Sequence, residues 1–248
     1  MECYWSSEDR PGTPDYCILP DGCVDILFAT QNREPVSLAV VGLMTTPLTC
    51  EVEPGRAFFA VRFRPGMAAA FIPEAALLND RVEPLESVWG PAARQMSERL
   101  AESSAPESMA GVIEEILRPL EPPDSAQRAL WRLPDTSIPL NCLASYAGLS
   151  DRHFRRACLE RAGVSPKYMR RILRFRKAAD RLRAIEAATS QPNWAQFAAA
   201  CGYYDQAHLI REFQEFAGCT PGRFVQSRKG RGSLESSHHE PGKTRKSN

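Results

Sequence analysis

The sequence predicts an α+β N-terminal domain, antiparallel and β-rich at first and then helical, and an all-α C-terminal domain with two helix-turn-helix motifs. Three observations predict this division. Short apolar runs separated by turn residues fill residues 1–63, one pattern occurs twice within residues 140–224, and the two halves carry opposite charges. Residues 1–130 contain 10 Lys and Arg against 20 Asp and Glu, a net charge of −10, whereas residues 131–248 have a net charge of +11. This asymmetry indicates that the basic half binds a polyanion.

Runs rich in β-branched and aromatic residues predict the strands of the N-terminal domain. Turn residues such as Pro20-Asp21-Gly22 separate these runs, and the spacing favours a mainly antiparallel sheet that can curl into a small barrel. The expected strands cover residues 16–19, 23–28, 37–43, 48–52 and 57–63.

From Pro65-Gly66 onward the pattern becomes helical. Apolar residues at helical spacing within residues 106–117 form a packing face, either against the N-terminal domain or against a second subunit. Shorter helices are expected at residues 65–71, 84–90 and 92–100.

Pro122 and Pro123 mark the domain boundary, because two prolines block both a helix and a central strand. We therefore expect an N-terminal domain at residues 1–120, a linker at 121–127 and a second domain at 128–226. Residues 227–248 are polar with almost nothing apolar to bury, so we expect a disordered tail.

The C-terminal domain contains a duplicated unit. Residues 153–166 and 208–221 lie 55 positions apart and share six identical residues, and a repeat at a fixed offset indicates a duplicated supersecondary structure. Each copy follows a short alanine-containing stretch that ends in glycine, at Gly148 and at Gly202. A helix, a turn at glycine and a second helix with arginine is the layout of a helix-turn-helix motif.

The second helix of each copy has an outward face suited to reading DNA. In the first copy Ser150 caps the helix and Phe154 faces the core, so that Arg152, Arg155 and Arg156 point outward, where arginine can bind guanine bidentately. In the second copy Asp205 is the cap, and glutamine and apolar side chains suit adenine and the thymine methyl group. Its outward residues are Gln206, Ala207, Ile210 and Arg211.

A basic helix at residues 166–184 separates the two copies. Its 19 residues span about 28 Å, close to the ~34 Å between successive major-groove faces. We expect Arg170 and Arg174 on this helix, and Arg223 after the second copy, to lie near phosphates.

Each of these residues also has a plainer interpretation. A helix with many arginines usually presents them on a solvated face. His153 and His208 precede residues expected to be buried, so they are more typical of structural or phosphate-contacting side chains. Glu160 and Glu215 are expected to pair with nearby arginines. DNA binding follows from the conjunction of the repeat, the turn glycines, the placement of arginine, the spacer length and the charge.

Residues 202–213, with 218–224 behind them, resemble the signature at the end of the DNA-binding domain of the AraC/XylS family of bacterial transcription regulators. Residues 148–168 resemble the first helix-turn-helix of that family. The resemblance covers about residues 128–226 and implies seven helices with two recognition helices in consecutive major grooves. Three departures, Trp194, Tyr203 and Leu209, are apolar exchanges in the expected core.

The first 120 residues are similar to an N-terminal module of the DUF6597 type that precedes such DNA-binding domains. The similarity rests on residues 19–27, 41–42, 61–66 and 89–90. It implies a sensor or dimerisation domain of a transcription factor that binds double-stranded DNA. An unidentified small-molecule effector, RNA polymerase and a second copy of the chain are further partners that the resemblance leaves open.

Four polar residues of the N-terminal domain are candidates for a ligand site. Asp21 and Asp25 flank a turn and a strand, and Arg62 and Arg64 alternate on another strand. They form either a turn cap with a surface salt bridge or part of a pocket for a small polar ligand.

The eight cysteines lack a CxxC pair, and no histidine precedes His153. Cys142, Cys158 and Cys201 fall at expected core positions and are interpreted as small buried hydrophobes. Convergence of Cys3, Cys17, Cys23 and Cys50 would leave two alternatives, a structural zinc site or a DNA-targeted, cysteine-dependent enzyme of the alkyl-transfer or repair type. A third alternative is an interaction module whose basic half holds RNA or another acidic partner.

We expect no enzymatic activity, no metal and no cofactor. The N-terminus lacks the pattern of a signal peptide and no apolar stretch approaches 18 residues, so we expect a cytoplasmic protein in a reducing compartment, without a membrane partner.

Overall fold

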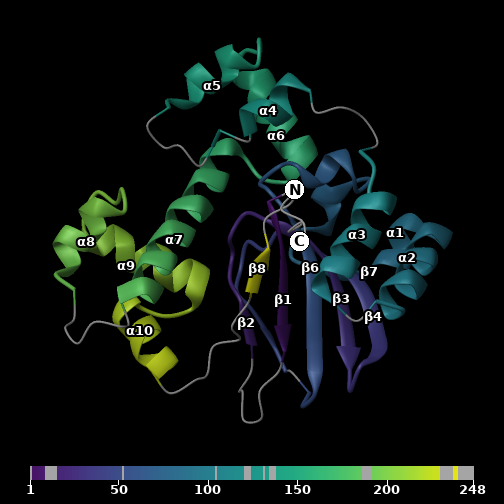
Figure 1. The fold of residues 1–248 in the computed structure, drawn as a ribbon. Helices are drawn as coiled ribbons and strands as arrows, with labels where there is room; N and C mark the ends of the chain where they lie inside the picture. Colours follow the sequence, from purple (N-terminus) through teal and green to yellow (C-terminus); the bar gives the residue numbers. More distant parts are fainter. Residues whose placement is uncertain are drawn as a thin grey trace, which may run out of the picture.

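The computed structural model describes residues 2–8, 16–51, 53–103, 105–119, 124–130, 132–133, 138–185, 192–229 and 237–239. A β-sheet with helices on one side forms the N-terminal part, and the helices of the C-terminal part lie beside the sheet and across one of its ends (Figure 1). The long helix α7 (Pro166–Ile185) runs between two groups of shorter helices.

The main sheet is antiparallel, as the sequence predicts, with strand order β7-β4-β3-β6-β1-β8. Strands β2 and β5 form a separate two-stranded sheet, so the strands of the described residues form two sheets, whereas the sequence allowed a small barrel. The strands are β1 (Cys3–Glu8), β2 (Tyr16–Ile18), β3 (Val24–Gln31), β4 (Glu34–Val41), β5 (Leu48–Cys50), β6 (Arg56–Phe63), β7 (Val82–Pro84) and β8 (Ser237–His239).

One face of the sheet carries the core of the N-terminal domain. On β3 and β6, Ile26 faces Val61 and Phe28 faces Phe59, all four are buried, and Tyr4 of β1 stacks on Phe59 at 6.0 Å. Helices α1 (Leu85–Trp89), α2 (Pro91–Ala101) and α3 (Pro106–Ile116) cover this face. The short helices η1 (Ala68–Ala70) and η2 (Ala75–Leu78) follow β6.

The packing face of α3 belongs to this core. Ile113 is buried, and Tyr4 Oη donates a hydrogen bond to Glu114 Oε1 at 3.3 Å, so the helix packs on the sheet of its own chain. Of the two interpretations of residues 106–117, the structure supports packing against the N-terminal domain.

Seven helices are described in the C-terminal part: α4 (Ser125–Leu130), α5 (Leu140–Tyr146), α6 (Asp151–Ala162), α7, α8 (Trp194–Ala200), α9 (Gln206–Ala217) and α10 (Pro221–Lys229). The pairs α5–α6 and α8–α9 are the first and second helix-turn-helix motifs. Their turns contain Gly148 and Gly202 at φ of 68° and 81°, a conformation that glycine adopts without steric cost.

The two domains share one continuous core. Gly22, beside the start of β3, leaves room for α7, since a Cβ there would lie 3.1 Å from Met169 Sδ. Gly66, after β6, leaves room for α4, since a Cβ there would lie 2.8 Å from Leu130 Cδ1. Residues at the ends of β3 and β6 therefore form part of the surface on which α4 and α7 rest.

Two segments differ from the expected boundaries. Helix α4 begins at Ser125, inside the expected linker, because its apolar side packs into the shared core. The expected disordered tail contains the end of α10 and strand β8, which pairs with Tyr4–Ser6 of β1. Without β8, β1 would be the edge strand of the sheet and would offer unpaired backbone groups to any extended segment within reach, a contact that composition does not predict.

Candidate nucleic-acid interface

Local capping fixes both ends of α6. Ser150 Oγ accepts a hydrogen bond from the backbone N–H of His153 at 3.4 Å and lies 2.9 Å from His153 Nδ1. Gly163 ends the helix at φ 69°, and Phe154 holds the inner side in the core. The outer face is left to solvent, and His153 has a local structural partner.

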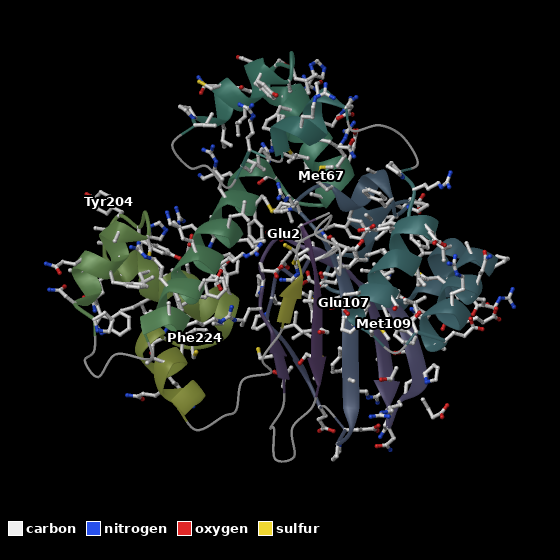
Figure 2. The ribbon with its side chains drawn as sticks, in the orientation of Figure 1. Glu2, Met67, Glu107, Met109, Tyr204 and Phe224 are labelled. Atoms are coloured by element: carbon white, nitrogen blue, oxygen red, sulfur yellow. The ribbon has the colours of Figure 1, made fainter. Side chains whose placement is uncertain are left out.

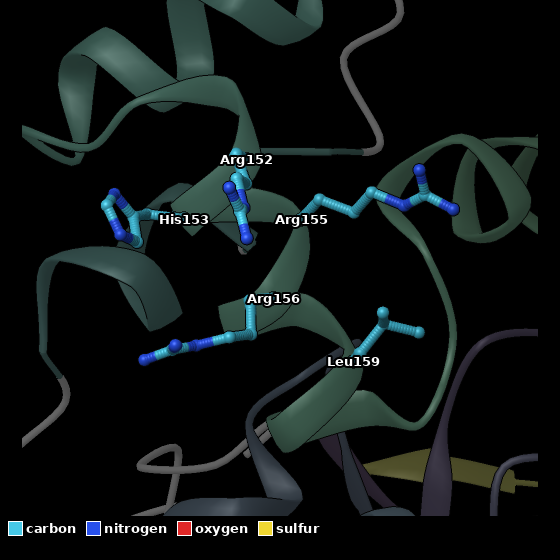
Figure 3. Close-up of a pocket in the computed structure, with 5 residues that line it drawn as sticks. All are labelled: Arg152, His153, Arg155, Arg156 and Leu159. Atoms are coloured by element: carbon cyan, nitrogen blue, oxygen red, sulfur yellow. The ribbon is translucent and has the colours of Figure 1, made fainter.

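Three arginines project from this outer face. Arg152, Arg155 and Arg156 surround a shallow hollow of about 360 Å³ together with His153 and Leu159 (Figure 3). Among the described residues, Arg152 and Arg155 have no ion-pair partner, whereas Arg156 Nε lies 3.2 Å from Glu160 Oε1 in an exposed pair. An exposed pair of this kind opens at little cost, so all three guanidinium groups are available to an anion.

Helix α9 repeats this arrangement with different side chains. Asp205 Oδ1 accepts from the backbone N–H of His208 at 2.6 Å, and Gly218 ends the helix at φ 67°. Leu209 and Phe213 are buried, which leaves Gln206, Ala207 and Arg211 exposed and Ile210 half-buried. Tyr204, just before the cap, is 91% exposed and lies at the outer edge of this motif (Figure 2).

A buried carboxylate fastens α9 to α7. Glu212 is 2% exposed; its Oε1 accepts from Arg171 Nε at 3.0 Å, and its Oε2 accepts from Arg174 Nε at 3.2 Å. The Arg174 guanidinium also lies 4.9 Å from the Tyr203 ring centroid. Burial, and then the neighbouring Glu212, raise the pKa of Tyr203. The network therefore holds α9 against α7.

Sequence reasoning missed Glu212 and Tyr204. Glu212 stands where the first copy has Ala157, so the difference between the two copies was the available signal. For Tyr204 the signal was an aromatic residue directly before the cap.

Two arginines of the spacer helix that are expected near phosphates have partners within the chain. Arg174 is paired with Glu212 of α9, and Arg170 donates through Nη2 to the carbonyl of Ile138, just before α5. Arg181 donates to the carbonyl of Ala200 at 2.7 Å. Arg223 is exposed, as a phosphate contact requires. Glu160 and Glu215 do pair with nearby arginines, Arg156 and Arg171.

Three of the four polar candidates in the N-terminal domain come together. Arg62 binds Asp25 through Nε at 2.9 Å and Nη2 at 2.7 Å, and its Nη1 lies 2.9 Å from Asp21 Oδ2. Asp21 also caps the turn, accepting from the N–H of Cys23 at 2.9 Å. Burial raises the pKa of Asp25, and Arg62 opposes this. The turn cap is confirmed, but the salt bridge is largely buried, and Arg64 is not part of it.

Burial dominates the surroundings of most cysteines among the described residues. Burial raises the pKa of Cys3, Cys23, Cys50 and Cys201, and that of Cys158 to about 12, whereas a nucleophilic cysteine needs a lowered pKa. Cys158 and Cys201 are buried as expected, but Cys142 is exposed. No cluster of metal-ligating side chains occurs within the described ranges.

Two domain families match the chain. Residues 143–227 match a helix-turn-helix domain, and residues 1–84 match a domain of unknown function, DUF6597. The first match covers α5–α10 except for the start of α5 and the end of α10, and it includes both repeated motifs. No match was found among curated protein sequences.

Solved structures resemble the chain at low sequence identity. A DNA-binding transcriptional dual regulator from Escherichia coli K-12 is 18% identical with a TM-score of 0.36, covering 46% of this chain and 99% of its own. The C-terminal domain of AraT, a response regulator from Geobacillus stearothermophilus, is 22% identical with a TM-score of 0.36, covering 48% and 95%. ToxT from Vibrio cholerae O395 is 8% identical with a TM-score of 0.45, covering 93% and 98%. No described helix has the length and apolar character needed to cross a membrane.

Proposed function

We propose that this chain, a DNA-binding transcription factor that joins an AraC-type helix-turn-helix domain to a DUF6597 domain, reads two half-sites of one operator in consecutive major grooves. In this proposal α6 enters one groove and α9 the next. The N-terminal domain serves as the effector-binding or dimerisation module of a cytoplasmic bacterial regulator.

One observation supports this proposal above the others. Two recognition helices, each capped at its start by a Ser or Asp side chain and ended by a left-handed glycine, are joined by the 20-residue helix α7. Twenty residues span about 30 Å, which suits the ~34 Å between successive major-groove faces. Two arginines tie the spacer helix α7 to both motifs. Arg170 contacts the carbonyl of Ile138, just before α5, and Arg174 pairs with Glu212 on α9.

The exposed side chains give each helix a separate role in the proposal. Arg152, Arg155 and Arg156 favour guanine, because guanidinium groups bind its O6 and N7 bidentately. Gln206 suits adenine, and Ala207 and Ile210 suit the thymine methyl group, with Arg211 as a further base contact. Arg223, which is exposed, serves as a phosphate contact in this proposal.

Selection from random duplexes with the full chain tests the proposal. Enrichment of a site with two different motifs about one helical turn apart, bound with a steep salt dependence, is the expected result. Recovery of no motif, with equal binding to any polyanion, would contradict it. RNA polymerase, an effector and a second copy of the chain are tested separately, by transcription assays on the selected site and by ligand-dependent footprinting.

A further inference from the structure

The two recognition helices end in the same way but in different surroundings. Gly163 and Gly218 lie 55 positions apart, and both are left-handed, at φ 69° and 67°. A Cβ at Gly218 would meet nothing within 4 Å. A Cβ at Gly163 would lie 2.2 Å from Asn79 Nδ2 and 2.7 Å from the carbonyl oxygen of Ala76. Glycine is therefore needed at position 163 for two reasons, the left-handed backbone conformation and the close approach of the N-terminal domain to the end of α6.

Asn79 completes the end of α6. Its Nδ2 donates a hydrogen bond to the carbonyl oxygen of Ala162 at 3.0 Å. The last carbonyl groups of a helix lack partners within the helix and need an outside donor. Here the donor comes from the N-terminal domain, 83 positions earlier in the chain. We call Ala76, Asn79, Ala162 and Gly163 the α6–η2 junction.

The N-terminal side of this junction is held in place by its own contacts. Asp80, next to Asn79, accepts from Thr45 N and Thr45 Oγ1, both at 2.6 Å. This ties the loop after η2 to the segment between β4 and β5. Hydrogen bonds of two adjacent residues, Asn79 and Asp80, therefore connect the segment between β4 and β5 with the end of α6.

The two recognition helices also pack against different neighbours. Helix α6 packs on η1 and η2 of the N-terminal domain, in addition to α4, α5 and α7. The elements that pack most against α9 are α7, α8 and α10, all within the C-terminal domain. The contact with the N-terminal domain is thus concentrated on the first motif.

We propose that the α6–η2 junction is the contact through which the N-terminal domain controls DNA binding, and that this control acts on the first helix-turn-helix alone. Asn79 is a positioning residue that acts on DNA through α6. The junction lies at the end of α6 opposite the exposed Arg152, so the N-terminal domain sets the position of the readout face without covering it. This inference rests on the proposed function.

Footprinting of the full chain on the selected operator tests the inference, because each half-site reports one recognition helix. Asn79→Ala removes the donor and is expected to weaken protection of the α6 half-site about fivefold, the change that corresponds to one net hydrogen bond. Asn79→Asp has the same shape but sets a carboxylate oxygen against the Ala162 carbonyl, so its loss should be larger. Protection of the α9 half-site should stay unchanged in both variants.

The two glycines provide a matched pair of variants. Gly163→Ala and Gly218→Ala introduce the same left-handed strain, but only the first drives a Cβ into Asn79 and Ala76. Gly163→Ala should therefore weaken the α6 half-site, and hydrogen exchange at residues 76–80 should increase. In Gly218→Ala, the α6 half-site and exchange at residues 76–80 should match the unsubstituted chain.

The outcomes separate this inference from the proposed function. Equal losses at both half-sites in the Asn79 variants, or no loss at the α6 half-site, would overturn control through the junction. Hydrogen exchange and thermal unfolding of each variant show whether it is folded. If the unsubstituted chain protects no specific site on any duplex, the proposed function itself fails, whatever the variants do.

Discussion

Arg176 of α7 binds Glu2, the residue that precedes β1, with Nη2 3.3 Å from Oε1 (Figure 2 labels Glu2). The Nη1 of the same guanidinium lies 3.2 Å from Cys23 Sγ, and Cys23 Sγ lies 3.2 Å from Glu2 Oε2. A cation of the DNA-binding domain is thus shared by two residues of the N-terminal domain, beside the Arg62–Asp25 pair.

The Arg176–Glu2 contact should contribute measurably to stability, because both side chains are only 28% exposed. A double-mutant cycle with Arg176→Gln and Glu2→Gln, followed by urea unfolding, should give a coupling of about 1 kcal/mol. The control is the more exposed Arg183–Asp180 pair on α7, whose coupling should be close to zero. Equal couplings for the two pairs would contradict the expectation.

Removal of the buried carboxylate Glu212 should be much more costly. Glu212→Gln leaves the guanidinium groups of Arg171 and Arg174 without their anionic partner, and the expected loss in the free energy of unfolding is about 3 kcal/mol. The neighbouring Glu215 is 42% exposed, so Glu215→Gln should cost less than about 1 kcal/mol. Urea unfolding of the two variants measures the difference, and similar losses would show that the network does not fasten α9.

Arg156 and Arg223 should affect DNA binding in different ways. Arg156→Ala should cost about 1–3 kcal/mol on the selected site and relax the preference at one base position, as expected for a base contact. Arg223→Ala should weaken all sequences alike and lower the salt slope by about one, as expected for a phosphate contact. Binding to cognate and random duplexes over a salt series tells these apart. An equal loss on both duplexes for Arg156→Ala would rule out its role in base readout.

Stability should fall in alkaline solution because of Cys158. Burial raises the pKa of this thiol from 9.0 to about 12, so between these values the folded chain keeps a proton that the unfolded chain releases. Its contribution is fully present below about pH 9 and is lost as the pH rises toward 12, at about 1.4 kcal/mol per pH unit. Cys158→Ala should lower the slope of unfolding free energy against pH by this amount. An unchanged slope in Cys158→Ala would contradict this expectation.

The C-terminal domain was predictable because its signals are local. Ser150, Asn193 and Asp205 each cap a helix as their positions predict, and the spacing of buried residues sets the helix faces. The strands β3 and β6 were predictable for the same reason. Strand β1 was missed because Trp5-Ser6-Ser7-Glu8 has no β-branched residue, and its pairing with β6 joins residues 49 to 59 positions apart.

The parts that sequence reasoning could not supply depend on distant contacts. On an arginine-rich helix, nothing in the local pattern shows that Arg174 meets Glu212, 38 positions later, whereas Arg223 stays exposed. The interpretation of Asp21, Asp25 and Arg62 as surface residues or as a pocket missed the third possibility, an internal ion-pair network beside the domain boundary. The exposed position of Cys142 was missed because a short helix leaves the choice of inner face open.

The continuous core between the domains has a consequence for engineering. A chimera that exchanges the N-terminal domain at the proline pair, Pro122-Pro123, would take Gly66 and Leu130 from different parents, and likewise Gly22 and Met169, so the apolar surfaces that meet there would no longer match. A cut between α7 and α8 keeps these contacts within one parent, but it divides Arg171 and Arg174 from Glu212, so a replacement for the second helix-turn-helix must carry a carboxylate at the position of Glu212.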